Sequence, residues 1–247
     1  MTVPRLHLPE RLAAGATLAV VGDRAHYLRH VLRLKEGDPV HAFNAGDGEW
    51  RAVIKGIGRH EMRLEIERLL RPAVPEPGPT LAFAPIRRNR LEWLVEKAVE
   101  LGVARLVPVI TQRTVVKPEK ADRLAAIATE AAEQCERLTV PPIDPPRPLP
   151  AWLAARAPAV PLFLADERGE GAAIAEAWHR HPDAEILIGP EGGFAPEEVE
   201  RLRAVPGVVP VTLGPRILRA ETAALYALVG WQIARPALAR ISPPTSS

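Results

Sequence analysis

Short apolar runs alternate with amphipathic stretches over most of the chain. Beyond Pro79, apolar runs that end near glycine or proline predict strands at 81–86, 106–110, 160–165, 186–188 and 208–213. Apolar residues at helical spacing predict helices at 89–101, 118–137 and 171–180, from Pro196, and from Arg219 or Ala220 to Ala234. A proline-rich loop is expected from Pro141 to Pro150. This alternation predicts an α/β domain with a mainly parallel sheet.

The first 72 residues have a different pattern, with several short strands and one helix. Strands are predicted at 17–21, 38–44, 49–57 and 62–70, and a helix at 24–34. The Ala-Gly-Asp-Gly turn at 45–48 predicts a hairpin, in which Asp-Gly supplies the positions with φ > 0. Together these features predict a small β-barrel.

Residues 72–79, PAVPEPGP, predict a linker between two domains. Proline and glycine at this density do not continue a strand or a helix, and they favour an extended, semi-rigid connection. We therefore predict domains at 1–72 and 73–247.

Composition and charge exclude several classes of protein. The 247 residues are 47% hydrophobic and 25% charged, as expected for a globular protein with a real core. A single cysteine, Cys135, excludes a disulfide framework and a cysteine-rich metal site. The N-terminal residues lack the apolar run of a signal peptide, and no run is long enough to span a membrane. We expect a cytoplasmic protein without a metal or a membrane partner.

Two glycine loops form the candidate site. The predicted strands at 186–188 and 208–213 end in glycine, at Gly189 and Gly214, and a predicted helix follows each. Ligands in parallel sheets bind beyond the carboxyl ends of the strands. Glycine also lets backbone approach a ligand closely, since it has no Cβ. Two such loops in tandem favour a binding site over ordinary turns.

Arginine follows several of the predicted strands, and this favours an anionic partner. Arg87, Arg88 and Arg90 follow the first α/β strand, Arg113 follows the second, and Arg137 ends the long helix. Guanidinium groups bind phosphate through paired hydrogen bonds, so such a ring of arginines suits a nucleotide or RNA. The basic face around Arg29 and Arg33 is either a phosphate site or a solvated helix surface.

Common catalytic motifs are absent from the sequence. It contains no G-x-G-x-x-G after an early strand, no nucleotide P-loop, no paired-histidine metal motif and no G-x-S-x-G elbow. Cys135 lies among Ala and Glu in a predicted helix, where packing is the simplest role. The remaining interpretation is a site in which backbone amides of the glycine loops hold a cofactor.

The combined motifs resemble those of a known family. LIGPEGGFAPEEVE (187–200) and LGPRILRAETAAL (213–225) are similar to the signature of the bacterial 16S rRNA uracil-N3 methyltransferases, the RsmE family of the SPOUT class. Similar segments are HVLRLKEGD (30–38), EKAVELGVARLVPVITQRTVV (96–116) and AAEQCERLTVPPI (131–143). The last departs from the family pattern, because Thr139 and Pro142 replace an arginine and a glutamate. The resemblance covers nearly the whole chain.

This resemblance implies a fold, a cofactor and partners. The expected fold is a PUA-like β-barrel for RNA binding followed by a SPOUT parallel sheet with a C-terminal trefoil knot. The expected cofactor is S-adenosylmethionine, and the substrate is one uridine in the decoding region of 16S rRNA in the small ribosomal subunit. A homodimer is also implied.

The same resemblance implies site residues. Those expected to bind the cofactor are Leu164, Ala165, Asp166, Ile188, Gly189, Pro190, Glu191, Gly192, Gly193, Leu213, Gly214, Ile217, Leu218, Arg219 and Thr222. Arg219 is also the candidate for stabilising charge on a uracil carbonyl oxygen. Glu221 and Thr222 are candidates for hydrogen bonding at the start of the last helix or for proton removal. Candidate RNA contacts are Arg29, Arg33, Arg87, Arg88, Arg113 and Arg137.

Three alternatives remain open at this point. The first is a SPOUT methyltransferase for tRNA or another rRNA base. The second is a non-catalytic RNA-binding factor in ribosome assembly, and the third is a doubly wound enzyme for a phosphorylated sugar. Affinity for S-adenosylmethionine, together with activity lost in Arg219→Ala, discriminates among enzyme, binding module and sugar enzyme.

Overall fold

The computed structural model of the chain describes residues 3–165 and 171–235. These residues fall into two compact units. The first unit holds the residues up to Glu76 together with Ala132–Val140. The second holds Pro77–Ala131 and the described residues from Pro141 onward. None of the described helices is long and apolar enough to cross a membrane.

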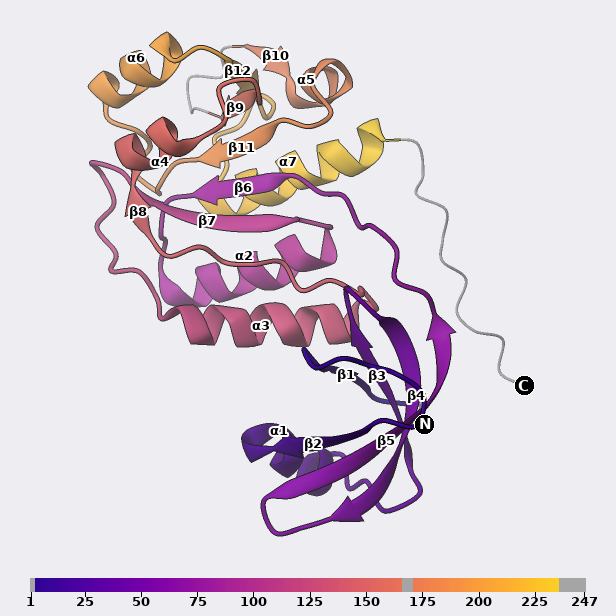
Figure 1. The fold of residues 1–247 in the computed structure, drawn as a ribbon. Helices are drawn as coiled ribbons and strands as arrows, with labels where there is room; N and C mark the ends of the chain where they lie inside the picture. The colour runs from indigo at the N-terminus through magenta and orange to yellow at the C-terminus, as the bar shows by residue number, and fades with distance from the viewer. Residues whose placement is uncertain (1–2, 166–170, 236–247) are drawn as a thin grey trace. The chain divides into compact units, whose positions relative to one another are not determined.

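The first unit is built on a five-stranded sheet, drawn in indigo and purple in Figure 1. Its order is β1 (Arg5–His7), β3 (Pro39–Asn44), β4 (Gly48–Ile57), β5 (Glu61–Arg71) and β2 (Thr17–Val21). β1 pairs parallel with β3, and the other pairs are antiparallel. The predicted helix is divided into α1 (Gly22–His26) and the π-helix η1 (Tyr27–Val31). The four predicted strands are confirmed, whereas β1 was not predicted because three residues carry too little periodicity.

Alternation along the strands builds the core of this unit. Ile54 of β4 and both Leu64 and Ile66 of β5 are fully buried, and Leu28 of η1 packs with them. The predicted hairpin is confirmed by the pairing of Asn44 with Gly48. Gly48, at φ +85°, is the one residue of this turn with positive φ. A Cβ there would lie 2.2 Å from the carbonyl oxygen of Arg71, so the turn requires glycine.

A buried carboxylate organises the charged residues of the first unit. The side chain of Glu49 is 4% exposed, and its Oε1 lies 3.0 Å from Arg5 Nε and 3.3 Å from His41 Nδ1. Glu49 also pairs with Arg71. Burial raises the pKa of Glu49. The hydrogen bond with His41 and the charges of Arg5 and Arg71 outweigh this and lower that pKa to about 2. The carboxylate therefore stays ionised at neutral pH.

The same two arginines bind the end of a helix. α3 (Ala121–Gln134) ends within the segment that belongs to the first unit. Arg5 donates to the carbonyl oxygens of Ala132, Glu133 and Arg137, each at 2.9–3.0 Å, and Arg71 donates to that of Glu136 at 2.9 Å. Carbonyls at a helix C-terminus have no partner within the helix, and cations stabilise them.

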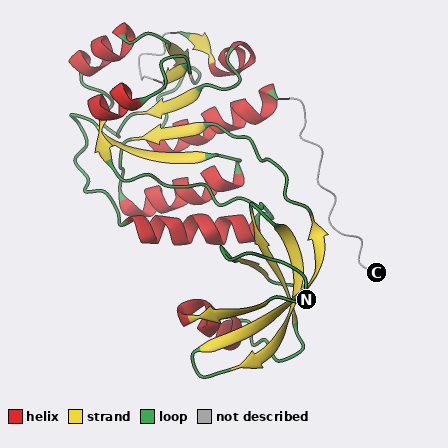
Figure 2. Cartoon of the chain, viewed as in Figure 1, coloured by secondary structure: helices red, strands yellow, loops and turns green. Residues whose placement is uncertain are grey.

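The second unit contains a parallel sheet, as predicted. Its order is β10 (Ala172–Ala173), β12 (Val208–Thr212), β9 (Leu162–Ala165), β11 (Glu185–Ile188), β6 (Thr80–Phe83), β7 (Arg105–Ile110) and β8 (Arg147–Pro148). All its pairs are parallel. The strands are nearly continuous apolar runs because helices cover both faces (Figure 2).

Alternate strand residues face different helices. Leu162 and Leu164 share a cluster with α4 (Leu149–Ala155) and α6 (Pro196–Ala204). Phe163, on the opposite face, meets Trp178 of α5 (Ile174–Arg180) edge-on at 4.6 Å between ring centroids. Both α5 and α2 (Arg88–Glu100) pack against α7 (Ala220–Ala234). Two layers of helices thus enclose the sheet.

Several predicted boundaries in this unit were wrong, including the end of the first strand, which is Phe83 and not Ile86, and the end of α3, which is Gln134 and not Arg137. The expected loop up to Pro150 is interrupted by β8, and α4 begins at Leu149. Proline is tolerated in the first turn of a helix, so Pro150 does not prevent α4. The helix expected from Gly171 begins at Ile174, because Ala172 and Ala173 pair with β12. α3 begins at Ala121 instead of Pro118.

Replacing Glu49 with Gln removes the buried charge and keeps the side-chain size. We expect the free energy of unfolding at pH 7 to fall by about 3–5 kcal/mol, since two buried arginines lose their counter-charge. The wild-type chain loses this contribution only as the pH falls from 4.5 towards about 2, because folding lowers the pKa of Glu49. Urea unfolding of the wild-type and Glu49→Gln chains, at pH 7 and over this pH range, measures the difference in their free energies of unfolding.

The matched control is Glu67→Gln. Glu67 pairs with Arg51 between partly exposed side chains of β4 and β5, so we expect a loss below about 1 kcal/mol. Equal losses in the two variants would contradict a special role for Glu49.

Candidate functional site

The register of three neighbouring strands creates the site. β9 lies between β11 and β12, and its last residue, Ala165, is paired with both Ile188 and Val211. The carboxyl ends of these strands therefore lie at the same level. The two glycine loops, which follow β11 and β12, meet beyond this edge of the sheet.

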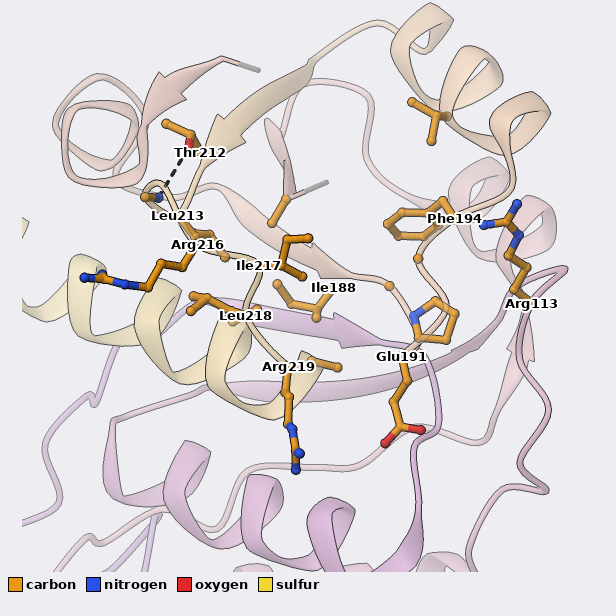
Figure 3. Close-up of a pocket in the computed structure, with 18 of the residues that line it drawn as sticks. Arg113, Ile188, Glu191, Phe194, Thr212, Leu213, Arg216, Ile217, Leu218 and Arg219 are labelled. Atoms are coloured by element: carbon orange, nitrogen blue, oxygen red, sulfur yellow. Dashed lines mark hydrogen bonds between the residues drawn. The ribbon is translucent and has the colours of Figure 1, made fainter. Parts of the chain in front are cut away.

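A pocket of about 500 Å³ lies between these loops (Figure 3). Apart from two arginines, its lining comes from the segment between Ala165 and Ala223. It consists of Arg90, Arg113, Ala165, Ile188, Gly189, Pro190, Glu191, Gly193, Phe194, Pro196, Val199, Thr212, Leu213, Gly214, Arg216, Ile217, Leu218, Arg219, Ala220 and Ala223. Apolar side chains, glycine backbone and several charged side chains, among them four arginines and Glu191, together make the walls.

Packing against Phe194 shapes the first glycine loop. A Cβ on Gly189 would lie 2.9 Å from the ring of Phe194, which is buried. Gly193 has φ +67°, and its N–H donates to the carbonyl oxygen of Pro190 at 2.9 Å. Glu198 of α6 accepts from the backbone N–H groups of Ala195, at 3.1 Å, and of Gln112, at 2.8 Å. The predicted helix start at Pro196 is confirmed.

The second glycine loop leaves open space above its backbone. Gly214 has φ +100°, and a Cβ built there would meet no atom within 4 Å. Its N–H donates to Thr212 Oγ1 at 3.3 Å, as the dashed line in Figure 3 marks. Arg219 precedes α7, and its carbonyl oxygen accepts the N–H of Ala223 at 2.8 Å. Arg219 and Glu191 extend away from the apolar side chains of Ile188 and Leu218 (Figure 3).

Two arginines from other elements contact the first loop. Arg90, in the first turn of α2, pairs with Glu191, and its Nε lies 3.6 Å from Glu221 Oε1. Glu221 is only 7% exposed, and its Oε2 has no hydrogen-bond partner among the described residues. Arg113, which follows β7, donates through Nη1 to the carbonyl oxygen of Gly192 at 2.9 Å.

Most residues predicted for the cofactor line this pocket. Four residues that were predicted for the site do not line it. Leu164 is fully buried in the core, and Gly192, Glu221 and Thr222 lie outside the lining. Asp166 lies outside the described residues. Sequence reasoning assigned no role here to Phe194, although it belongs to the GPEGGF motif. It named Arg90 only among the arginines that follow the first α/β strand, and not as a residue of this pocket.

The arginines predicted to contact RNA fall into different surroundings. Of these, Arg113 alone lines the pocket. Arg88 is ion-paired with Glu92 at 2.8 Å and lies 3.9 Å from Glu119, and Arg87 is exposed. Arg137, 11% exposed, is held in the first unit by Glu76 and Thr139. This last environment favours a structural role.

The two remaining arginines belong to the first unit. Arg29 donates to the carbonyl oxygen of Gly58 at 3.1 Å and lines a cavity of about 240 Å³ with His26, His30 and His60. Arg33 is exposed and has φ +55°. Among the residues that the structure describes, no three His, Cys, Asp or Glu are grouped to hold a metal ion.

Family models match both parts of the chain. Residues 75–232 match an RNA methyltransferase domain, and residues 22–67 match an RNA methyltransferase PUA domain. The chain is 32% identical to the ribosomal RNA small subunit methyltransferase E of Rickettsia conorii, over 92% of this chain and 94% of that protein. It is 30% identical to the Bacillus subtilis protein of the same name, over 89% and 91%.

Solved structures are similar over the whole length. One is a ribosomal RNA small subunit methyltransferase E from Neisseria gonorrhoeae bound to S-adenosylmethionine. Its TM-score is 0.83 at 28% identity, over 94% of this chain and 98% of that one. Another is a putative methyltransferase from Legionella pneumophila with the same cofactor, with a TM-score of 0.84 at 30% identity, over 95% and 98%.

Replacing Gly189 with Ala places a methyl group against the buried ring of Phe194. We expect the free energy of unfolding to fall by about 1–3 kcal/mol, because the ring has to move. Gly192→Ala is the matched control in the same loop, since a Cβ there meets nothing within 4 Å and its φ is not positive. Urea denaturation measures both. Losses of equal size would contradict the packing argument.

Proposed function

The chain belongs to the ribosomal RNA small subunit methyltransferase E family, and we propose that it methylates N3 of one uridine of 16S rRNA with S-adenosylmethionine. The observation that carries this proposal is the pocket at the level ends of β9, β11 and β12. Family membership supports the methyl transfer and the small-subunit RNA substrate. The uridine N3 and the decoding region rest on the sequence resemblance.

The residues of the pocket fit this cofactor. A volume of about 500 Å³ lies in the range of small-molecule sites, which are apolar with a few polar groups. Ile188, Leu213 and Leu218 supply apolar walls for an adenine ring. The glycine backbone at Gly189 and Gly214 supplies hydrogen-bonding groups that no side chain covers. When bound, S-adenosylmethionine supplies a methyl group on a positively charged sulfur.

The chain itself has to orient the uracil and balance its charge. Removal of the N3 proton leaves negative charge on the uracil imide. Arg219 lines the pocket where α7 begins, and its guanidinium would stabilise this charge at a carbonyl oxygen. Thr222, in the first turn of α7, would donate a hydrogen bond. Glu221, one oxygen of which has no hydrogen-bond partner among the described residues, is the proposed group for proton removal or for positioning.

The first unit is proposed to bind RNA. It matches a PUA domain model, and it carries Arg29 and Arg33 near exposed histidines. Of the remaining arginines, Arg113 at the pocket is the best placed to meet the phosphates of the target strand. N3 lies on the pairing edge of uracil, so the target base has to be unpaired or flipped out.

Several finer features complete the proposal. The segment from β11 to α7 is proposed to form a trefoil knot, and two copies of the chain to form a homodimer in the cytoplasm. The boundary near residue 72 is proposed to separate the RNA-binding domain from the methyltransferase domain. The knot and the homodimer rest on the resemblance of the IGPEGG and LGPRILRAETA motifs, and the domain boundary rests on the proline-rich linker at 72–79.

The direct test is transfer of labelled methyl from S-adenosylmethionine to small ribosomal subunits that lack the modification. Label on N3 of a single uridine is expected, and free rRNA is the comparison substrate. If the chain binds the cofactor but transfers no methyl group to either RNA, the proposed rRNA substrate is contradicted. If it shows no cofactor binding and no methyl transfer, the result favours a non-catalytic RNA-binding factor.

Arg219→Ala tests the charge-stabilising role. We expect the turnover number to fall by about 10²–10³, the usual effect of losing one group that stabilises transition-state charge. The turnover number is expected to fall by a larger factor than the affinity for S-adenosylmethionine, because Arg219 lines the cofactor pocket and in addition acts on the uracil. Single-turnover assays and calorimetry measure the two quantities.

The control is Arg201→Ala, which removes an exposed arginine from α6 outside the pocket lining. A similar loss of turnover in both variants would contradict a specific role for Arg219.

A further inference from the structure

We propose that Arg90 is a positioning residue of the cofactor pocket and sets its affinity for S-adenosylmethionine by tying Glu191 to Glu221. This inference rests on the proposed function. Arg90 belongs to α2, in the half of the second unit that precedes the glycine loops. The pocket lining otherwise comes from the segment between Ala165 and Ala223, with the exception of Arg113. Arg90 therefore contacts this segment from an element that is not part of it.

The guanidinium of Arg90 contacts two carboxylates, of which Glu191 lines the pocket and Glu221 lies outside its lining. Glu191 belongs to the loop after β11, and Glu221 to the first turn of α7. These residues are 30 positions apart in the chain, and Arg90 pairs with both. Two carboxylates beside one cation leave a net negative charge. Without the cation they would repel each other, and the two segments would separate.

Burial makes the contact with Glu221 energetically important. Its side chain is 9% exposed, and Oε2 has no hydrogen-bond partner in the described part of the chain. Arg90 is also the one cation that pairs with Glu221 among the described residues. A buried carboxylate without a partner is strongly unfavourable. Glu221 therefore keeps Arg90 in place, and Arg90 in turn keeps Glu191 in place.

The loop that carries Glu191 needs such a contact. Residues 189–193 contain three glycines, one of them at φ +67°, so the backbone has little conformational preference of its own. Arg113 holds the carbonyl oxygen of Gly192 at 2.9 Å, which leaves the Glu191 side of the loop to Arg90. A pocket ordered before binding spends less free energy on ordering the loop when the cofactor binds.

Arg90→Met tests this inference, because it removes the charge and keeps the length of the stem. We expect the dissociation constant for S-adenosylmethionine to rise about ten-fold, as for loss of one coupled contact. The Gly192 contact remains, so the chain is expected to stay folded. Isothermal calorimetry measures the affinity, and thermal unfolding verifies that the variant is folded at the assay temperature.

Lys97→Met is the matched control. It removes a cation from the same helix, and Lys97 pairs with Glu96 and Glu100 instead of pocket residues. It is expected to bind the cofactor like the wild-type chain.

A double-mutant cycle with Glu191→Gln separates positioning from general stability. If Arg90 acts through Glu191, the double variant is expected to bind S-adenosylmethionine as weakly as Arg90→Met alone. Additive losses would overturn the inference. So would wild-type affinity in folded Arg90→Met, even where its melting temperature is lower.

The failure of this inference and that of the proposed function are distinguishable. A wild-type chain that binds S-adenosylmethionine and methylates rRNA, with an Arg90→Met variant of equal affinity, overturns the role of Arg90 alone. A wild-type chain without affinity for S-adenosylmethionine overturns both.

Discussion

The register of β9 between β11 and β12 is the constraint on which the pocket depends. Backbone hydrogen bonds set Ala165 opposite both Ile188 and Val211, so three strands end level with one another. A shift by one residue would move every side chain of β9 to the opposite face and separate the loops. The buried apolar faces of Leu164 and Phe163, each packed against different helices, prevent this shift.

Buried carboxylates held by arginine recur in both units. Glu49 gathers Arg5 and Arg71, which in turn bind the carbonyls at the end of α3. Glu221 holds Arg90, which reaches the glycine loop. In each case a buried carboxylate is paired with arginine, and the guanidinium has donors left for a second segment. Such contacts fasten parts of the chain that no strand or helix connects.

Sequence reasoning found the long elements and missed the short ones. The range of α7 and the start of α6 at Pro196 were predicted correctly, since apolar spacing and a helix-start residue both mark them. β8 and β10, with two residues each, carry no measurable periodicity. α4 was hidden because a proline that usually breaks structure is accepted in its first turn.

The sequence alone was enough to indicate the α/β class, the two glycine loops and the family resemblance, because periodicity and glycine are local properties of the chain. Strand order decided the rest. It brought Arg90 to Glu191 across 101 positions and buried Leu164 in the core instead of the pocket. No local pattern encodes which distant residue becomes a partner, since that depends on how the strands pair and which faces the helices bury.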